Sequence, residues 1–209
     1  MLKVGLTGGI AAGKSSVGEM FVALGAHLIQ ADAIAHQLMQ PGEAVYQEVA
    51  RHFGAGILDQ NGQINRARLA ESAFGAASRI QELNQIVHPP VIRKHDEWME
   101  EMGRRDPHAI AIVEAALILE AGLVKHFDRI IVVTCQPEQR IERWTQRTHV
   151  DTETARKEVA RRMAAQLPDE EKIKVADYVI DNSGSLDATS AQVGVVYKEL
   201  KRQALVSGL

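Results

Sequence analysis

A lysine and a serine stand at the end of a glycine-rich stretch near the amino terminus. The pattern Gly8-x-x-x-x-Gly13-Lys14-Ser15 comes directly after the short apolar run 4–6. Glycines let a main chain fold closely around a chain of phosphates, so that successive N–H groups point into a concave anion site. A lysine adds a mobile positive charge for the β- and γ-phosphates, and a serine hydroxyl is a ligand for Mg²⁺. The pattern therefore predicts a nucleoside triphosphate site, with ATP as the ligand and Ser15 as the metal ligand.

The residues after this loop have the spacing of a helix. Val17, Met20, Phe21 and Leu24 fall on one helical face, and Gly25 is typical of a helix end. The positive N-terminus of such a helix would meet the phosphates. A chance glycine-rich turn could show the same pattern, but the strand before it and the helix after it favour a phosphate-binding loop. We expect these residues to hold the nucleotide: Gly8, Gly9, Ala11, Ala12, Gly13, Lys14, Ser15 and Ser16.

Two carboxylates follow predicted strands, where ligands gather in open α/β sheets. Asp32 comes after the strand predicted at 26–29, and Glu114 comes after the apolar run 109–113. Asp32 is placed to face the phosphates, or it caps a helix that begins at Ala33. Glu114 can hold Mg²⁺ through water, or it is an ordinary loop carboxylate.

A group of arginines follows the strand predicted at 130–134. Arg140, Arg143 and Arg147 share one face of a helix that starts near Pro137. Such a stripe is usually a solvated face. Next to a phosphate site, the same arginines can neutralise charge on a transferring phosphoryl group. The local excess of positive charge that continues beyond this helix suits a mobile lid that closes over ATP.

The order of the predicted elements indicates an α/β protein with a parallel sheet. Continuous apolar runs of strand length suit parallel strands that are covered on both faces. Residues 41–106 show helical spacing and turns without a strand, which indicates a helical insertion for a second substrate. Within it, His88-Pro89-Pro90 is expected to interrupt a helix that starts near Arg79, because proline lacks the N–H donor and clashes with the preceding turn.

The overall composition excludes several classes of protein. The chain has 209 residues, 45% of them hydrophobic, and a net charge of −3, which does not suggest a nucleic-acid surface. Cys135 is the only cysteine, so an internal disulfide is impossible and a cysteine-based zinc site is implausible. No apolar run approaches membrane-spanning length, and we expect no signal peptide before the loop. We therefore expect a soluble protein of the cytoplasm.

Taken together, the motifs resemble the dephospho-coenzyme A kinase family. The resemblance extends over nearly the whole chain and rests on these segments: Gly5-Leu6-Thr7-Gly8-Gly9-Ile10 through Gly13-Lys14-Ser15-Ser16, Ala31-Asp32-Ala33-Ile34-Ala35-His36, Phe53-Gly54, Asp59 to Arg66, Leu83-Asn84 with His88-Pro89, and Ala176 to Asn182. Two positions depart from the pattern. Gln30 stands where the family commonly has aspartate, and residues 114–120 read EAALILE where the family usually has Asp-x-Pro-Leu-Leu-x-Glu.

The resemblance implies a P-loop kinase fold, in which a five-stranded parallel sheet is flanked by helices. It implies a nucleotide-binding core of residues 1–40, 107–139 and 175–209, a helical acceptor domain of residues 41–106 and a lid of residues 140–174. It also implies transfer of the γ-phosphoryl group of ATP to the ribose 3′-hydroxyl of dephospho-coenzyme A, with Mg²⁺. No nucleic acid, membrane or obligate protein partner is expected.

The resemblance also suggests roles for single residues. Asp32 matches the family's base for the acceptor hydroxyl, while Arg140, Arg147 and Gln166 match its lid and nucleotide-side pattern. With Lys14, the two arginines would stabilise developing charge. On the acceptor side we group these residues: Asp32, Arg66, Asn84, His88 and Glu114.

Two alternatives stay open from the sequence. Another P-loop kinase, acting on a nucleoside, nucleotide or sugar, would share everything except the acceptor-side motifs. An NTP-hydrolysing switch would use the same loop to change the binding of a partner, although a helical insertion suits a substrate better.

Overall fold

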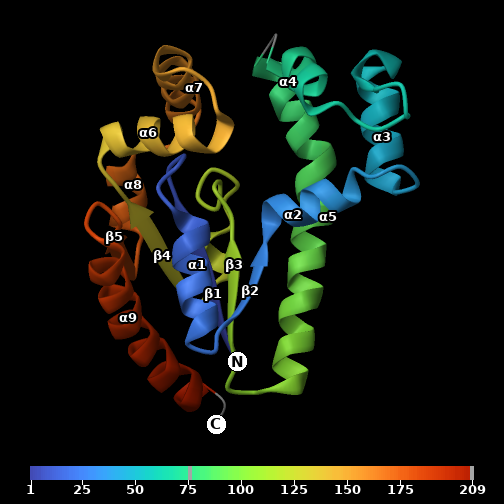
Figure 1. Ribbon diagram of the computed structural model, residues 1–209. Helices are drawn as coiled ribbons and strands as arrows, with labels where there is room; N and C mark the ends of the chain where they lie inside the picture. Colours follow the sequence, from blue (N-terminus) through green and yellow to red (C-terminus); the bar gives the residue numbers. More distant parts are fainter. Residues whose placement is uncertain (75–76, 208–209) are drawn as a thin grey trace. The chain divides into compact units, whose positions relative to one another are not determined.

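The computed structural model describes residues 1–74 and 77–207. Within these ranges, one sheet has five strands in the order β2-β3-β1-β4-β5 (Figure 1). The strands are β1 (Leu2–Gly8), β2 (His27–Gln30), β3 (Ile110–Glu114), β4 (Arg129–Thr134) and β5 (Tyr178–Asp181). Strand β1 pairs in parallel with β3 and β4, and β4 pairs in parallel with β5. The predicted α/β fold with a five-stranded parallel core is confirmed.

Helices connect these strands along the chain. The α-helices are α1 (Lys14–Ala23), α2 (Ala31–Leu38), α3 (Ala44–Phe53), α4 (Arg66–Phe74), α5 (Ala77–Arg105), α6 (Pro137–Thr148), α7 (Thr152–Ala164), α8 (Asp169–Lys174) and α9 (Leu186–Ser207). The short 3-10 helices are η1 (Ala55–Ile57) and η2 (Val124–His126). None of the helices within the described ranges is both long enough and apolar enough to cross a membrane.

The described residues form two compact units. The first comprises Met1–Ile29 and Glu101–Leu209, and it holds nearly all of the sheet together with α1 and α6 to α9. The second comprises Gln30–Glu100 and is mainly helical, with α2, α3, α4 and most of α5.

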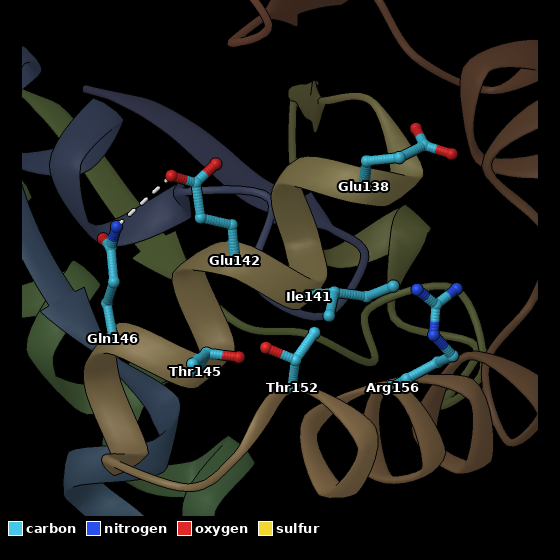
Figure 2. A pocket seen from close by; sticks show the side chains of 7 residues that line it. All are labelled: Glu138, Ile141, Glu142, Thr145, Gln146, Thr152 and Arg156. Atoms are coloured by element: carbon cyan, nitrogen blue, oxygen red, sulfur yellow. Dashed lines mark hydrogen bonds between the residues drawn. The ribbon is translucent and has the colours of Figure 1, made fainter.

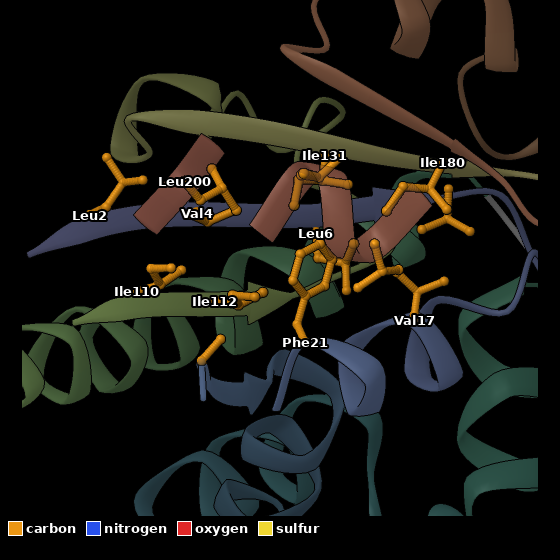
Figure 3. Packing of buried hydrophobic residues seen from close by; sticks show 14 of the residues in the cluster. Leu2, Val4, Leu6, Val17, Phe21, Ile110, Ile112, Ile131, Ile180 and Leu200 are labelled. Carbon is orange, nitrogen blue, oxygen red and sulfur yellow. The ribbon is translucent and has the colours of Figure 1, made fainter. Parts of the chain in front are cut away.

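The main core of the first unit lies between the sheet and two helices. Alternate residues of β1, namely Leu2, Val4 and Leu6, point to the same side and pack with Phe21 of α1 and Leu200 of α9 (Figure 3). A side chain of this size stabilises the fold by about 1.5–3 kcal/mol when it is fully buried. Because β1 precedes the glycine-rich loop and α1 follows it, this core fixes both ends of that loop.

Helix α1 confirms the helix predicted after the loop, with one difference. Val17 and Phe21 are fully buried, but Leu24 is 44% exposed. The helix ends at Ala23, and Gly25 turns the chain with φ of +106°, as the sequence predicts. Leu24 therefore lies beyond the helical face on which its spacing placed it.

Helix α5 contradicts the predicted break at the two prolines. It continues from Ala77 to Arg105 with Pro89 and Pro90 inside. A proline in a helix interior costs about 3 kcal/mol or more. Val87 and Val91 are buried on either side of the prolines, and their packing outweighs the local cost.

Helix α2 changes the interpretation of Asp32. The helix begins at Ala31, and Gln30 is its N-cap residue. Asp32 thus lies inside the first turn, and the prediction that it caps a helix starting at Ala33 is wrong. A carboxylate in the first turn still interacts favourably with the helix dipole.

Helix α8 is an element that the spacing of the sequence does not reveal. Its six residues make fewer than two turns, which is too short for a helical period to be visible. It carries Asp169 and the fully buried Lys172, whose partners are described below.

Candidate active site

The glycine-rich loop joins β1 to α1, as predicted. Gly8 has φ of +153° and Gly13 has φ of +93°, which side chains rarely adopt. A Cβ atom on Gly8 would lie 2.3 Å from the carbonyl oxygen of Val133, and one on Gly13 would lie 2.1 Å from Nδ2 of Asn182. Both glycines of the motif are therefore required by conformation and by close approach.

Lys14 begins α1 and reaches back over the loop. Its Nζ donates to the main-chain carbonyls of Gly8 and Gly9, at 3.2 Å each. Ala11 has φ of +54°, an unusual conformation for a residue with a side chain that costs about 1–2 kcal/mol. Strain of this kind clusters at ligand-binding loops. The ammonium group and the amino end of α1 make the loop an electropositive site for an anion.

Ser15 and Glu114 lie close together because β1, which leads into the loop before Ser15, pairs with β3, which ends at Glu114. The Ser15 hydroxyl donates to Oε1 of Glu114 at 2.8 Å, and Glu114 is only 8% exposed at the carboxyl end of β3. A hydroxyl and a carboxylate are the hard oxygen ligands that Mg²⁺ prefers. Within the described ranges, no group of three or more His, Cys, Asp or Glu side chains could hold a metal ion.

The Ala12 carbonyl is held from behind the loop by two side chains. Nδ2 of Asn182 donates to it at 2.9 Å, and Nη1 of Arg143 donates to it at 3.2 Å. Nη2 of Arg143 also donates to the main-chain oxygen of Asn182 at 2.8 Å. The Thr189 hydroxyl donates to Oδ1 of Asn182 at 3.0 Å, which fixes the orientation of the amide.

We call the hydrogen bonds from Asn182 and Arg143 to the Ala12 carbonyl the clamp. The clamp determines where the N–H of the following residue, Gly13, points. In a trans peptide the carbonyl and the following N–H point in opposite directions. Since the Ala12 carbonyl points to Asn182 and Arg143, the Gly13 N–H points away from them. The clamp therefore orients one of the amides that the loop offers to a phosphate.

Gln166 and Arg140 contact the opposite end of the loop. The side-chain Oε1 of Gln166 accepts the main-chain N–H of Ile10 at 3.1 Å. Arg140 is only 3% exposed, forms an ion pair with Asp169, and places Nη1 1.9 Å from where a Cβ atom on Gly9 would lie. These two predicted nucleotide-side residues both lie beside the loop.

Arg147 lies on an aromatic ring. Its guanidinium carbon is 4.7 Å from the centre of the Trp144 ring, and that of Arg162 is also 4.7 Å away. The hydrogen bond from Arg161, with a smaller contribution from Arg162, lowers the pKa of Glu158 to about 2, because it stabilises the charged form of the carboxylate. The arginine stripe predicted on α6 is thus divided among different partners.

The residues predicted on the acceptor side lie in the second unit, apart from Glu114. Asp32 is exposed in α2, and Arg66 is exposed at the start of α4. Asn84 and His88 are half-buried, four residues apart in α5, so they share one face of that helix. Burial lowers the pKa of His88, so its imidazole is mainly neutral at pH 7.

A separate pocket lies between α6 and α7 (Figure 2). It is lined by Glu138, Ile141, Glu142, Thr145, Gln146, Thr152 and Arg156. The carboxylates of Glu138 and Glu142 would repel a triphosphate. We therefore place the nucleotide at the loop and not in this pocket.

Cys135 is a buried free thiol. It follows β4, and its Sγ lies 3.9 Å from the Ala11 carbonyl oxygen. Burial raises the pKa of this thiol, which keeps it protonated and makes it a packing group beneath the loop.

Two residues that support the loop are absent from the predicted set. The sequence marks Arg143 only as part of an arginine stripe and Asn182 only as part of a family motif. Asn182 gave a signal, because it directly follows β5 and a polar side chain at that position faces the ligand edge of the sheet. Arg143 lies inside α6 and gave no such signal. The pairing of both with Ala12 depends on segments that lie 131 and 170 residues away.

The fold and the site define a P-loop protein of the kinase class: a parallel sheet whose first strand leads through a glycine-rich loop into a helix that begins with lysine and serine. A family model described as dephospho-CoA kinase matches residues 2–188. The chain belongs to the dephospho-CoA kinase family.

Known relatives agree with this assignment. The dephospho-CoA kinase of Aquifex aeolicus (strain VF5) is 39% identical over 202 residues, which cover 97% of this chain and 99% of that protein. The crystal structure of TT1252 from Thermus thermophilus matches with a TM-score of 0.77 and 31% identity, covering 94% of this chain and 96% of that one. Dephospho-CoA kinase from Campylobacter jejuni matches with a TM-score of 0.68 and 26% identity, covering 96% and 97%.

Membership of this family decides between the interpretations that the sequence left open. It supports the interpretation of the chain as a dephospho-CoA kinase. It does not support another small-molecule kinase or an NTP-hydrolysing switch.

Proposed function

We propose that this chain transfers the γ-phosphoryl group of ATP to the ribose 3′-hydroxyl of dephospho-coenzyme A, which gives coenzyme A and ADP in the last step of coenzyme A synthesis. The observation that carries the proposal is the family match over residues 2–188, joined to a phosphate loop in which Lys14 and Ser15 begin α1. ATP is the phosphoryl donor that a kinase family with this loop implies.

On the donor side, the chain acts by positioning and by charge. Amides of residues 11–16 would bind the phosphate oxygens, and Lys14 would neutralise charge that develops on the γ-phosphoryl group. Phosphoryl transfer needs little covalent chemistry from the protein, so fixed dipoles account for most of the rate. The clamp on Ala12 supports this role, because an amide that is oriented in advance does not have to reorganise during the reaction.

Ser15 and Glu114 are the residues that would hold Mg²⁺. The Ser15 hydroxyl would bind the ion directly, and Glu114 would bind it through a water molecule. When bound, Mg²⁺ neutralises charge on the β- and γ-phosphates. Because Glu114 accepts the Ser15 hydroxyl at 2.8 Å, we assign it to the metal side, in place of the acceptor side on which the sequence resemblance placed it.

On the acceptor side, Asp32 would orient the 3′-hydroxyl and accept its proton. Arg66 would contribute positive charge for the phosphates of dephospho-coenzyme A. Asn84 and His88 would contribute hydrogen bonds from one face of α5. The lowered pKa of His88 supports a neutral hydrogen-bonding role in preference to a charged one.

The lid arginines take two different roles in this proposal. Arg140, buried in its ion pair with Asp169, would hold the loop beside Gly9. Arg147 is exposed and stacks on the buried Trp144 ring, and it would move to the phosphates when the lid of residues 140–174 closes. Residues 41–106 would bind the acceptor, and residues 1–40, 107–139 and 175–209 would form the nucleotide-binding core.

The direct test is to incubate the pure protein with Mg-ATP and dephospho-coenzyme A and to weigh the product by mass spectrometry. Phosphorus NMR would then locate the new phosphate on the ribose. We expect ADP release that depends on this acceptor. Equal release with an unrelated nucleoside, or slow release without any acceptor, would contradict the proposal.

The Asp32→Asn substitution tests the role of the base. It should lower turnover by a factor of about 10² to 10⁴, the usual contribution of a general base, with ATP affinity little changed. Calorimetry with ATP is the control. A variant with near-normal turnover would remove Asp32 from this role.

A further inference from the structure

A buried lysine and a partly buried glutamate form an ion pair outside the set of residues that the proposed reaction uses. Lys172 of α8 is fully buried, and its Nζ lies 3.2 Å from Oε1 of Glu120. The side chain of Glu120 is 18% exposed and belongs to the segment after β3. Taking two such charges out of water costs several kcal/mol per ion, and their attraction must offset that cost.

The same carboxylate oxygen also holds a main-chain group. Oε1 of Glu120 accepts the N–H of Leu167 at 2.9 Å. Leu167 directly follows Gln166, whose side chain accepts the Ile10 N–H in the phosphate loop at 3.1 Å. One continuous set of contacts therefore runs from Lys172 through Glu120, Leu167 and Gln166 to the loop.

Stability alone does not account for a buried pair at this place. Replacing a buried ion pair by apolar side chains of similar volume is often neutral or stabilising. An apolar side chain, however, cannot accept the Leu167 N–H. The specific contribution of Glu120 is thus geometric: it fixes the main chain at Leu167, and the ion pair with Lys172 holds the carboxylate in place.

We propose that Glu120 and Lys172 are positioning residues that hold Gln166 against Ile10 and so keep the phosphate loop in its binding conformation. The inference deepens the proposed function and rests on it, because it assigns a supporting role in binding the phosphoryl donor. Neither residue would touch the nucleotide.

Two double variants separate the hydrogen bond from the charge. In Glu120→Leu/Lys172→Met, no buried charge remains and the acceptor for Leu167 is lost. In Glu120→Gln/Lys172→Met, the charges are also gone, but an amide oxygen can still accept the Leu167 N–H. We expect the first variant to raise the Kd for Mg-ATP about three- to tenfold, the worth of one hydrogen bond, and the second to stay within about twofold of the wild type.

A pair on the same helix provides the control. Lys174 and Glu171 of α8 form an exposed ion pair, 2.6 Å between Nζ and Oε1. Glu171→Leu/Lys174→Met makes the same chemical change on the same helix, and it should leave the Kd for ATP unchanged. The Kd for dephospho-coenzyme A should be the same in all of these variants.

The measurements are calorimetric titrations with ATP and with the acceptor, on variants shown to be folded by circular dichroism. Equal ATP affinity in the leucine and glutamine double variants would overturn the proposal. If the leucine variant does not fold, Glu120→Asp carries the test, because it keeps the charge but withdraws it from Leu167 by one methylene. A Kd for ATP unchanged in that variant would equally overturn it. A wild type that binds ATP but does not phosphorylate dephospho-coenzyme A would instead contradict the proposed function.

Discussion

The clamp behind the phosphate loop gives a prediction whose size can be worked out from the structure. Asn182 is 5% exposed, donates to the Ala12 carbonyl at 2.9 Å and accepts from Thr189 at 3.0 Å. Asn182→Leu has nearly the same volume and removes both interactions. The Ala12 carbonyl then keeps the hydrogen bond from Arg143 at 3.2 Å, and the Thr189 hydroxyl keeps its hydrogen bond to the Ser185 carbonyl at 3.3 Å.

Two lost hydrogen bonds, each worth about 0.5–1.5 kcal/mol, should lower the free energy of unfolding by about 1–3 kcal/mol. For a chain of this size, that corresponds to a fall in Tm of roughly 2–12 °C. The effect on ATP binding is separate. If the Gly13 N–H loses its orientation, a bond to a charged phosphate worth about 1.5–3 kcal/mol is weakened. Since Arg143 still holds the carbonyl, we expect the lower end, a rise in Kd of about tenfold.

The assay is calorimetry with Mg-ATP and, separately, with dephospho-coenzyme A, together with thermal unfolding. Gln192→Leu is the matched control. Gln192 contacts the same turn: its Oε1 accepts the Asp181 N–H at 3.0 Å, and its Nε2 donates to the Asp181 carbonyl at 2.9 Å. It should lower the Tm without changing the affinity for ATP. If Asn182→Leu lowers the Tm but leaves the Kd for ATP within twofold, the inference that the clamp orients Gly13 is refuted.

Three further predictions concern charge and the lid. Lys14→Ala should weaken ATP binding about 10- to 100-fold and lower turnover as well, because a charged hydrogen bond is lost; unchanged kinetics would contradict our interpretation of the loop. Glu158, with its pKa lowered to about 2, contributes stability that is present above its ordinary pKa near 4.5 and is lost as the pH falls toward 2. Glu158→Gln should therefore lower the Tm by about 2–4 °C at pH 7. The difference in Tm between variant and wild type should become smaller as the pH falls from 4.5 to about 2; a difference in Tm that does not change with pH would refute this role of Glu158. Trp98 and Trp144 are the two tryptophans of the chain, so Trp98→Phe leaves Trp144 as the fluorescent residue. In this background, the fluorescence of Trp144 should change when ATP draws Arg147 off the ring, and the change should disappear in Arg147→Leu; an unchanged spectrum would show that Arg147 stays on the ring.

The sequence by itself determined the phosphate loop and the class of fold. The two glycines are set by positive φ angles, and Lys14 and Ser15 are set by the start of a helix, which are local requirements. Continuous apolar runs fix buried parallel strands for an equally local reason, since every side chain of such a strand must avoid water. These features could be predicted because each depends on a few neighbouring residues.

Only the tertiary structure decided how the loop is held. The bonds from Arg143 and Asn182 to Ala12, and from Glu120 to Leu167, join segments that are 131, 170 and 47 residues apart in the chain. Pro89 and Pro90 continue a helix that their local chemistry would break, because buried neighbours on both sides outweigh it. Which polar group meets which, and whether a local preference is overruled, depends on how distant segments pack, and no spacing along the sequence records that.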